Sequence, residues 1–74
     1  MLKIKDNVDL KELEKFGLEK ECHSFNGESK ELYTYGEMII FVDTREIYSF
    51  RMRMDTVIKL FDLIQAGLVE KVEE

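Results

Sequence analysis

The sequence has few of the residues that support disulfide bonding, catalysis or metal binding. It contains a single cysteine, Cys22, a single histidine, His23, and no proline. One cysteine cannot form an intrachain disulfide, so nothing points to an oxidising, secreted environment. We interpret Cys22 as a small, semi-buried hydrophobic residue and His23 as an ordinary surface residue.

Catalytic chemistry has little support for the same reason. Cys22 and His23 are neighbours, and in an extended strand their side chains point to opposite faces, so they cannot readily form a nucleophile and base pair or share a metal. The acidic residues lack the spacing of a calcium-binding loop. The four glycines stand apart and form no phosphate-binding loop. We therefore expect no enzymatic activity, no metal and no cofactor.

A long apolar segment is also missing. The first residues, MLKIKDNVDLKELEK, alternate their charges and contain no apolar region of the kind found in signal peptides. The longest apolar run, MIIFV at 38–42, is far shorter than the roughly 20 residues that cross a bilayer. These features predict a soluble, cytoplasmic protein with no membrane partner.

Negative charge predominates, with 16 acidic against 11 basic side chains and a formal net charge of -5. Because nucleic-acid affinity depends on basic side chains that displace counterions, we expect no direct binding to nucleic acid. An alternative is that Arg51 and Arg53, near Lys59, form a basic, aromatic platform for single-stranded bases with Tyr33 and Tyr35. Cross-strand packing of the tyrosines and pairing of the arginines with carboxylates explain these residues more simply.

The remaining composition is that of a small globular protein. The 74 residues are 45% hydrophobic and 11% aromatic, which predicts one folded domain over 1–74. The core of so small a scaffold rarely supplies more than about 3–5 kcal/mol, and oligomerisation is a usual supplement where disulfides and metals are missing.

Local patterns in the first half predict a strand, a helix and a hairpin. Alternation at 2–5 indicates a short strand. Asp9 is placed to cap a helix over 10–16, and Gly17 follows where a left-handed cap is needed. After a strand at 18–25, the pair Asn26 and Gly27 predicts a hairpin turn, with the loop extending to Ser29.

The second half reads as strands followed by a helix. A strand at 32–35 ends at a turn formed by Gly36 and Glu37, and 38–42 is apolar at every position. A turn at 43–45 leads to an alternating, half-buried strand at 47–54. Asp55 or Thr56 can then cap a helix over 57–66, and a short last strand starts at 68. The expected buried face of this helix consists of Val57, Leu60, Phe61 and Ile64, with Leu63 beside it.

These elements predict an α+β fold. The expected sheet is an antiparallel three-stranded meander, which short terminal strands could extend, with two short helices packed on one face. The strand at 38–42 has no polar face, so a second element, a dimer partner or a bound protein must cover its other side.

The same strand and its neighbours form the predicted binding surface. Met38, Met52 and Met54 concentrate around it, and methionine suits both core filling and adaptable binding surfaces. We expect apolar surface here to exceed what two helices can cover. The residues predicted to contact a partner are Tyr33, Tyr35, Met38, Ile40, Val42, Arg51 and Arg53.

The ends of the chain resemble small, uncharacterised proteins encoded by phages and prophages of Gram-positive bacteria. The resemblance rests on MLKIKDNVDLKELEKFGLEK at the start and DLIQAGLVEKVEE at the close, and the middle, from Cys22 to Arg53, takes no part in it. It implies an accessory protein of a mobile element, a group in which small acidic proteins often bind and inhibit host or defence proteins. It assigns no role to any residue.

Two functions follow as hypotheses. The first is a non-enzymatic interaction module, homodimeric, that binds a protein partner through its sheet face or an exposed strand edge. The second is an acidic inhibitor that imitates nucleic acid and blocks a host or defence protein that handles nucleic acid. In that case carboxylates such as Glu12, Glu19 and Glu21 would occupy a basic groove.

Overall fold

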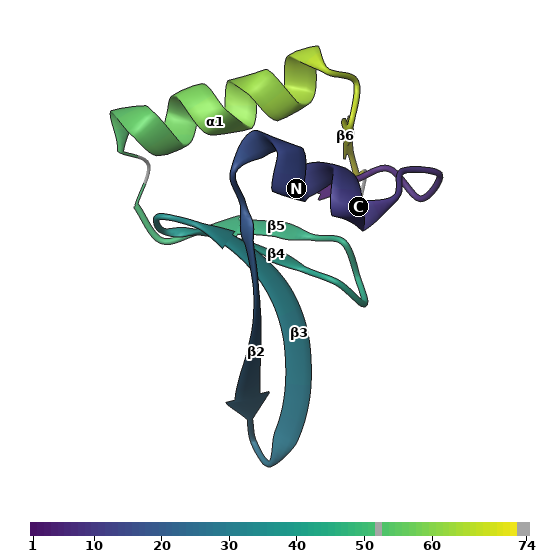
Figure 1. Cartoon of the computed structure of the whole chain (residues 1–74), viewed down its shortest axis with the longest axis vertical. Coiled ribbons are helices and arrows are strands. Elements are labelled where there is room, and N and C mark those ends of the chain that lie inside the picture. The colour runs from purple at the N-terminus through teal and green to yellow at the C-terminus, as the bar shows by residue number, and fades with distance from the viewer. Residues whose placement is uncertain (52, 73–74) are drawn as a thin grey trace.

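The computed structural model describes residues 1–51 and 53–72 and confirms the α+β class (Figure 1). A 3-10 helix and an α-helix accompany two small antiparallel sheets. In chain order the elements are β1 (Leu2–Ile4), η1 (Leu10–Phe16), β2 (Glu19–Phe25), β3 (Glu28–Tyr35), β4 (Met38–Phe41), β5 (Ile47–Ser49), α1 (Met54–Gln65) and β6 (Val69–Lys71).

The main sheet is a four-stranded meander in the order β2-β3-β4-β5, not the predicted three-stranded one. Its first two strands are the longest, and their hairpin projects from the body of the molecule (Figure 1). Asn26 and Gly27 form the tight turn with φ values of 50° and 82°. Because this two-residue turn suits the twist of a hairpin, β3 resumes at Glu28, and the expected loop to Ser29 is wrong.

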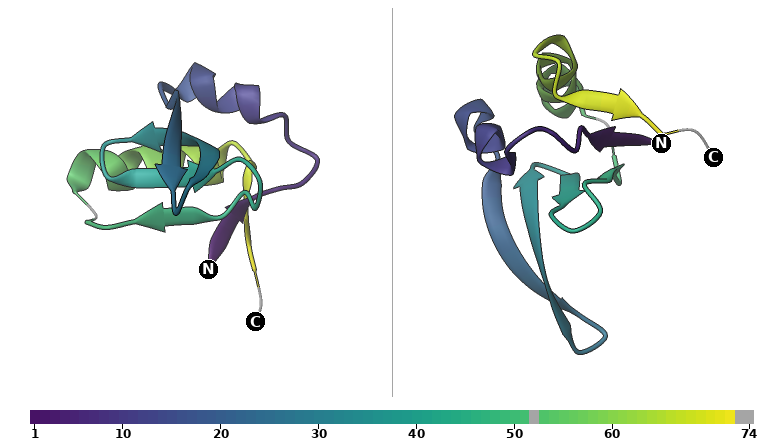
Figure 2. Two further views of the ribbon diagram at one scale, coloured as in Figure 1. Left: turned by 90° about the horizontal axis from the view of Figure 1, so that it is seen from below. Right: turned by 90° about the vertical axis from the view of Figure 1, so that its right-hand side faces the viewer.

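The terminal strands do not extend this meander as a ladder. β1 and β6 pair antiparallel with each other in a separate two-stranded sheet, in which Leu2 lies opposite Lys71 and Ile4 opposite Val69 (Figure 2). A single bridge between Lys3 and Glu46 links this pair to the segment before β5. Strand pairing therefore joins the two terminal segments of the chain.

The first helix has the predicted bounds and caps. The Asp9 carboxylate accepts a hydrogen bond from the Lys11 amide at 3.0 Å, which satisfies one of the unpaired amides at the helix start. Gly17 ends the helix in the left-handed region, with φ 89°. The segment is a 3-10 helix, the tighter form common in short pieces.

The second helix begins earlier than predicted. The expected strand at 47–54 stops at Ser49, and α1 starts at Met54, with Arg53 as an N-cap that makes no side-chain bond. Met52 lies outside the described residues. Alternation over 47–54 is equally compatible with a strand end followed by a helix start.

Both helices pack on one face of the meander. Figures 1 and 2 show the two helices on the same side of the meander, and Leu13 of η1 and Leu63 of α1 share a single buried cluster with the inward side chains of β3 and β4. The cluster consists of Ile4, Leu13, Leu18, Tyr33, Met38, Ile40 and Leu63. Met38 and Ile40 therefore form the inner side of the two-sided apolar strand.

The sheet itself covers the other side of that strand. Ile39 and Phe41 alternate with the buried residues and are half-buried on the outer face. The Phe41 ring contacts Tyr48 edge to face, with centroids 5.4 Å apart, and Phe25 similarly at 6.1 Å. Lys30 lies 5.9 Å above the Phe41 centroid. Side chains from other strands of the same sheet thus provide the cover that was expected from another element or a partner.

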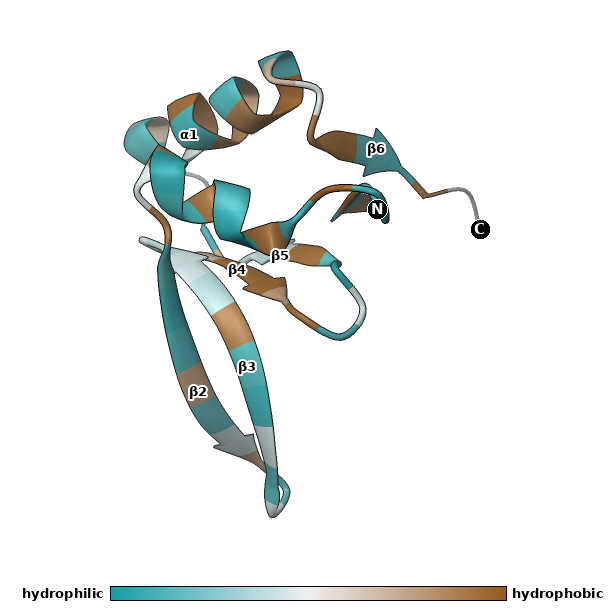
Figure 3. Cartoon of the chain, turned by 45° about the vertical axis from the view of Figure 1, so that its right-hand side comes forward, coloured by the Kyte–Doolittle hydropathy of each residue, from teal (hydrophilic) through white to brown (hydrophobic). Residues whose placement is uncertain are grey.

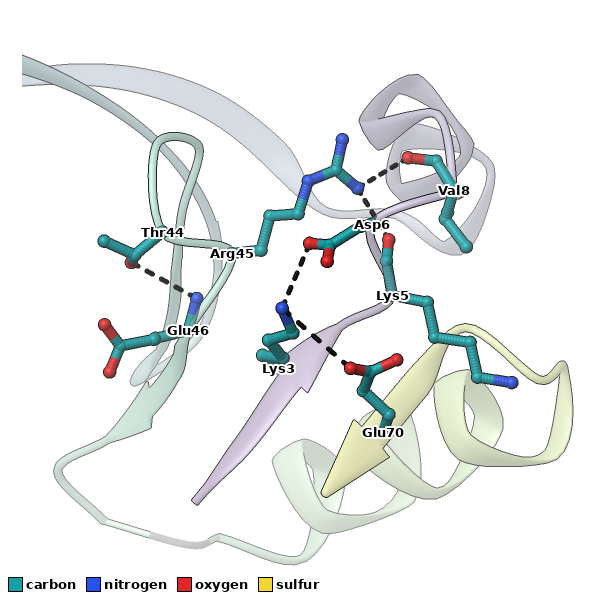
Figure 4. A network of polar contacts seen from close by, with 8 residues as sticks. All are labelled: Lys3, Lys5, Asp6, Val8, Thr44, Arg45, Glu46 and Glu70. Carbon is teal, nitrogen blue, oxygen red and sulfur yellow. Dashed lines mark hydrogen bonds and ion pairs between the residues drawn. The ribbon is translucent and has the colours of Figure 1, made fainter. Parts of the chain in front are cut away.

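Arg45 joins the turn before β5 to the N-terminal segment (Figure 4). Its Nη1 donates hydrogen bonds to the carbonyls of Lys5 at 2.7 Å and Val8 at 2.6 Å. Its own carbonyl accepts from the Ile4 amide at 2.9 Å. The residue has φ 64°, a left-handed conformation that non-glycine residues seldom adopt. The strained backbone of Arg45 therefore occurs at a residue that makes three hydrogen bonds to the N-terminal segment.

Candidate protein-interaction surface

The structure places the predicted binding residues mostly inside the protein. Tyr33, Met38 and Ile40 are buried in the core, and Tyr35 and Val42 pack against it. Only two of the seven, Arg51 and Arg53, are exposed; both belong to the segment before α1.

Each inward tyrosine also has an internal partner. The Tyr33 hydroxyl donates to Glu14 Oε2 at 3.3 Å, and Lys59 Nζ lies 4.9 Å from the centroid of the Tyr35 ring. Burial, and then Glu14, raises the pKa of the Tyr33 phenol, because both disfavour its ionised form. With Tyr33 buried and Tyr35 beneath Lys59, the aromatic platform proposed with the two arginines is not formed.

The exposed apolar surface lies instead on α1. Five hydrophobic side chains of this helix are each at least 40% exposed, and Met54 reaches 74%, Ile58 55% and Phe61 55%. We call them the α1 outer stripe, and the hydropathy of the helix is shown in Figure 3. The stripe consists of Met54, Val57, Ile58, Phe61 and Ile64.

The helix carries more apolar surface than the core can cover. At 100° per residue, its buried side consists of Thr56 and Leu63, with half-buried Leu60 beside them. The predicted buried face was therefore partly wrong, because Val57, Phe61 and Ile64 lie on the neighbouring, exposed side. A helix that is apolar over two adjacent sides gives no sequence signal of which side faces its own core.

The stripe itself is uncharged. The acidic residues of α1, Asp55 and Asp62, lie beyond its edge by the same 100° rotation, and the one lysine, Lys59, is directed to Tyr35. Phe50 in the segment leading into the helix is 78% exposed and adds further apolar surface before Met54. An apolar strip with charges only along its margin is the composition expected of an interface core.

The outer face of the meander is a smaller and more polar surface. Phe25 and Tyr48 are partly exposed there but are already engaged with Phe41. A shallow hollow of about 410 Å³ beside them is lined by two apolar and three polar or charged residues, Phe25, Asn26, Glu28, Lys30 and Phe41. The aromatic side chains of this face already contact one another, so this face leaves less apolar area for a partner to cover than α1 does.

The residues considered for catalysis lie on the exposed hairpin. His23 is opposite Lys30 and Cys22 opposite Glu31, so the two side chains leave opposite faces as predicted, but Cys22 is exposed and not semi-buried. His23 Nε2 lies 3.0 Å from Glu21 Oε1. The pKa of the Glu21 carboxyl is lowered, first by the hydrogen bond from the Thr34 hydroxyl and then by His23.

Within residues 1–51 and 53–72, no group of three or more histidine, cysteine or acidic side chains could hold a metal ion. No helix in this part of the chain is long and apolar enough to cross a membrane. Comparisons with protein-family models, with characterised proteins and with solved structures give no match. The resemblance of the chain ends to phage proteins therefore stays a prediction, and the interaction surface rests on the structure alone.

Proposed function

We propose that this chain is a non-enzymatic interaction module that acts by binding a protein through the α1 outer stripe. The observation that carries the proposal is a row of five large apolar side chains, exposed on one helix and free of charge along its length. Together they expose an apolar area on the order of 400 Å², within the range of patches that on small proteins are often functional.

The geometry matches a common mode of recognition. An amphipathic helix presents side chains three and four residues apart to an apolar groove or to another helix. The spacing Met54, Val57, Phe61 and Ile64 follows this rule, with Ile58 beside it. Removing the whole stripe from water is worth roughly 10 kcal/mol before the costs of association, at about 25 cal/mol per Å². Those costs consume a large share of this gain, so the expected affinity is moderate.

The resemblance to phage and prophage proteins supports a role as an accessory protein of a mobile element, in which binding a protein is the activity. The alternative, an acidic imitation of nucleic acid, gains no specific support. Glu12 pairs with Lys15 at 3.1 Å, and Glu21 is held by Thr34 and His23. Two of the three carboxylates expected to enter a basic groove are thus engaged within the chain.

Photo-crosslinking in the native host tests the proposal. A benzophenone amino acid replaces Ile58 in one variant and Ser24, an exposed hairpin residue, in the control. We expect ultraviolet light to join the position-58 variant to a protein and to leave the position-24 variant unchanged. The proposal is refuted if position 58 gives no protein adduct, or if both positions give the same adducts.

A further inference from the structure

The α1 outer stripe has the repeat of a helix-pairing seam. Met54 and Phe61 are seven residues apart, as are Val57 and Ile64, so the four occupy the two apolar positions of a heptad. From the first to the last they extend about 15 Å along the helix, at 1.5 Å per residue. A second helix with the same repeat fits such a seam by placing its side chains between these residues.

Charge restricts where two copies can meet. Each chain carries a net charge of -5, so most approaches between copies are repulsive. The stripe contains no charged residue. Two copies can therefore associate through this surface without placing like charges in contact. A two-fold symmetric interface requires the same surface on both partners.

The area is near the lower limit for a specific complex. Two stripes facing each other remove a total of roughly 800 Å² from water, which is at the small end for interfaces and suits a weak, reversible complex. The buried cluster of the monomer is small, and with the single cysteine Cys22 exposed no disulfide supports it. Oligomerisation is the remaining usual supplement for a scaffold of this size.

We infer that the protein bound by the α1 outer stripe is a second copy of this chain, which pairs α1 with α1 about a two-fold axis. The inference rests on the proposed function and names the partner. Because apolar contact drives the association while the net charges oppose it, added salt strengthens the dimer by screening the repulsion. A basic partner held by the acidic surface would show the opposite salt dependence.

Light scattering after size-exclusion chromatography tests the inference on the purified chain. We expect a monomer–dimer equilibrium with a Kd of roughly 10–100 μM, as suits a small interface, tightening severalfold between low and high salt. Ile58→Glu and Phe61→Glu each raise the Kd at least about tenfold, because each places a charge in the α1 outer stripe. Ser24→Glu adds the same charge on the hairpin and leaves the Kd within about twofold. We expect circular dichroism to show that both variants keep their helix, because Ile58 and Phe61 are exposed.

The outcomes separate the inference from the proposed function. A wild-type chain that stays monomeric to about 500 μM at every salt concentration overturns the inference, as does a dimer that both stripe variants leave intact. A crosslinked adduct at position 58 with the mass of another protein keeps the proposed function and overturns the second copy as occupant. An adduct of twice the chain mass of 8.8 kDa supports both.

Discussion

Replacing Arg45 with alanine should remove a large part of the stability of this protein. The side chain donates from one nitrogen to two carbonyls, those of Lys5 and Val8, and so ties the segment after β1 to the turn before β5. Hydrogen bonds from charged donors contribute about 1.5–3 kcal/mol each, and half-burial of Arg45 places these two toward the lower value. We expect Arg45→Ala to lower the free energy of unfolding by about 2–3 kcal/mol.

A glycine variant at the same position separates the effect of the lost side-chain hydrogen bonds from the effect of the strained backbone. Arg45 has φ 64°, where a Cβ costs roughly 1–2 kcal/mol that glycine does not incur. Arg45→Gly loses the same hydrogen bonds but gains this relief, so it should be about 1 kcal/mol more stable than Arg45→Ala. Arg51→Ala, an exposed arginine in the segment before α1, is the matched control and should shift stability by less than about 0.5 kcal/mol.

Urea denaturation followed by far-ultraviolet circular dichroism measures all three differences. In a domain of this size the loss in Arg45→Ala corresponds to a fall in Tm of about 10–20 °C. Amide exchange at Ile4, whose N–H donates to the Arg45 carbonyl, should accelerate in the same variant. Equal unfolding midpoints for Arg45→Ala and Arg51→Ala would refute the stabilising role of the Arg45 contacts. Equal stability of the alanine and glycine variants would refute the backbone strain.

Three further changes test other parts of the fold. Gly36→Ala should cost about 1–2 kcal/mol in urea denaturation, because φ is +57° and the new Cβ would lie 3.1 Å from Thr56 Oγ1; a midpoint equal to that of the wild type would contradict this. Thr56→Val should leave the same midpoint unchanged or raised, since the buried Thr56 hydroxyl has no hydrogen-bond partner among the described residues; a loss above about 1 kcal/mol would show that the hydroxyl is needed. The Tyr33 phenol has a raised pKa in the folded chain, so its contribution to stability is present below pH 10 and is lost as pH rises from 10 through the folded pKa. Tyr33→Phe should therefore show a shallower alkaline decrease in the free energy of unfolding than the wild type; a decrease as steep as that of the wild type would contradict this.

The elements that the sequence predicts correctly are those determined by neighbouring residues. Asp9 and Gly17 mark the ends of η1, and Asn26 with Gly27 marks the hairpin, because capping and tight turns depend on the preferences of a few adjacent side chains. Pairing of β1 with β6 depends on contacts between the two ends of the chain, which no local pattern specifies. The left-handed Arg45 was also missed, since only its distant carbonyl partners explain that conformation.

The candidate surface was missed for a related reason. The apolar strand at 38–42 was expected to have a free side, but Phe25 of β2 and Tyr48 of β5 contact Phe41 there. An excess of exposed apolar surface is present, as expected, but it lies on α1 and not on the strand at 38–42. The spacing of apolar residues can show that a helix has more of them than one buried side requires, and Phe61 and Ile64 provided that signal. Which side remains exposed is decided by tertiary packing of Leu63.

The pairing of the two chain ends has a consequence for synthesis on the ribosome. The four-stranded meander joins neighbouring segments through short turns, so it can form as soon as β5 has emerged. β1 is made before the meander, whereas its strand partner β6 and the core residue Leu63 come after the meander in the chain and emerge later. Until α1 and β6 emerge, β1 lacks its strand partner, and only η1 is available to cover the inner face of the sheet. Completion of the fold is therefore a late event in the synthesis of this domain.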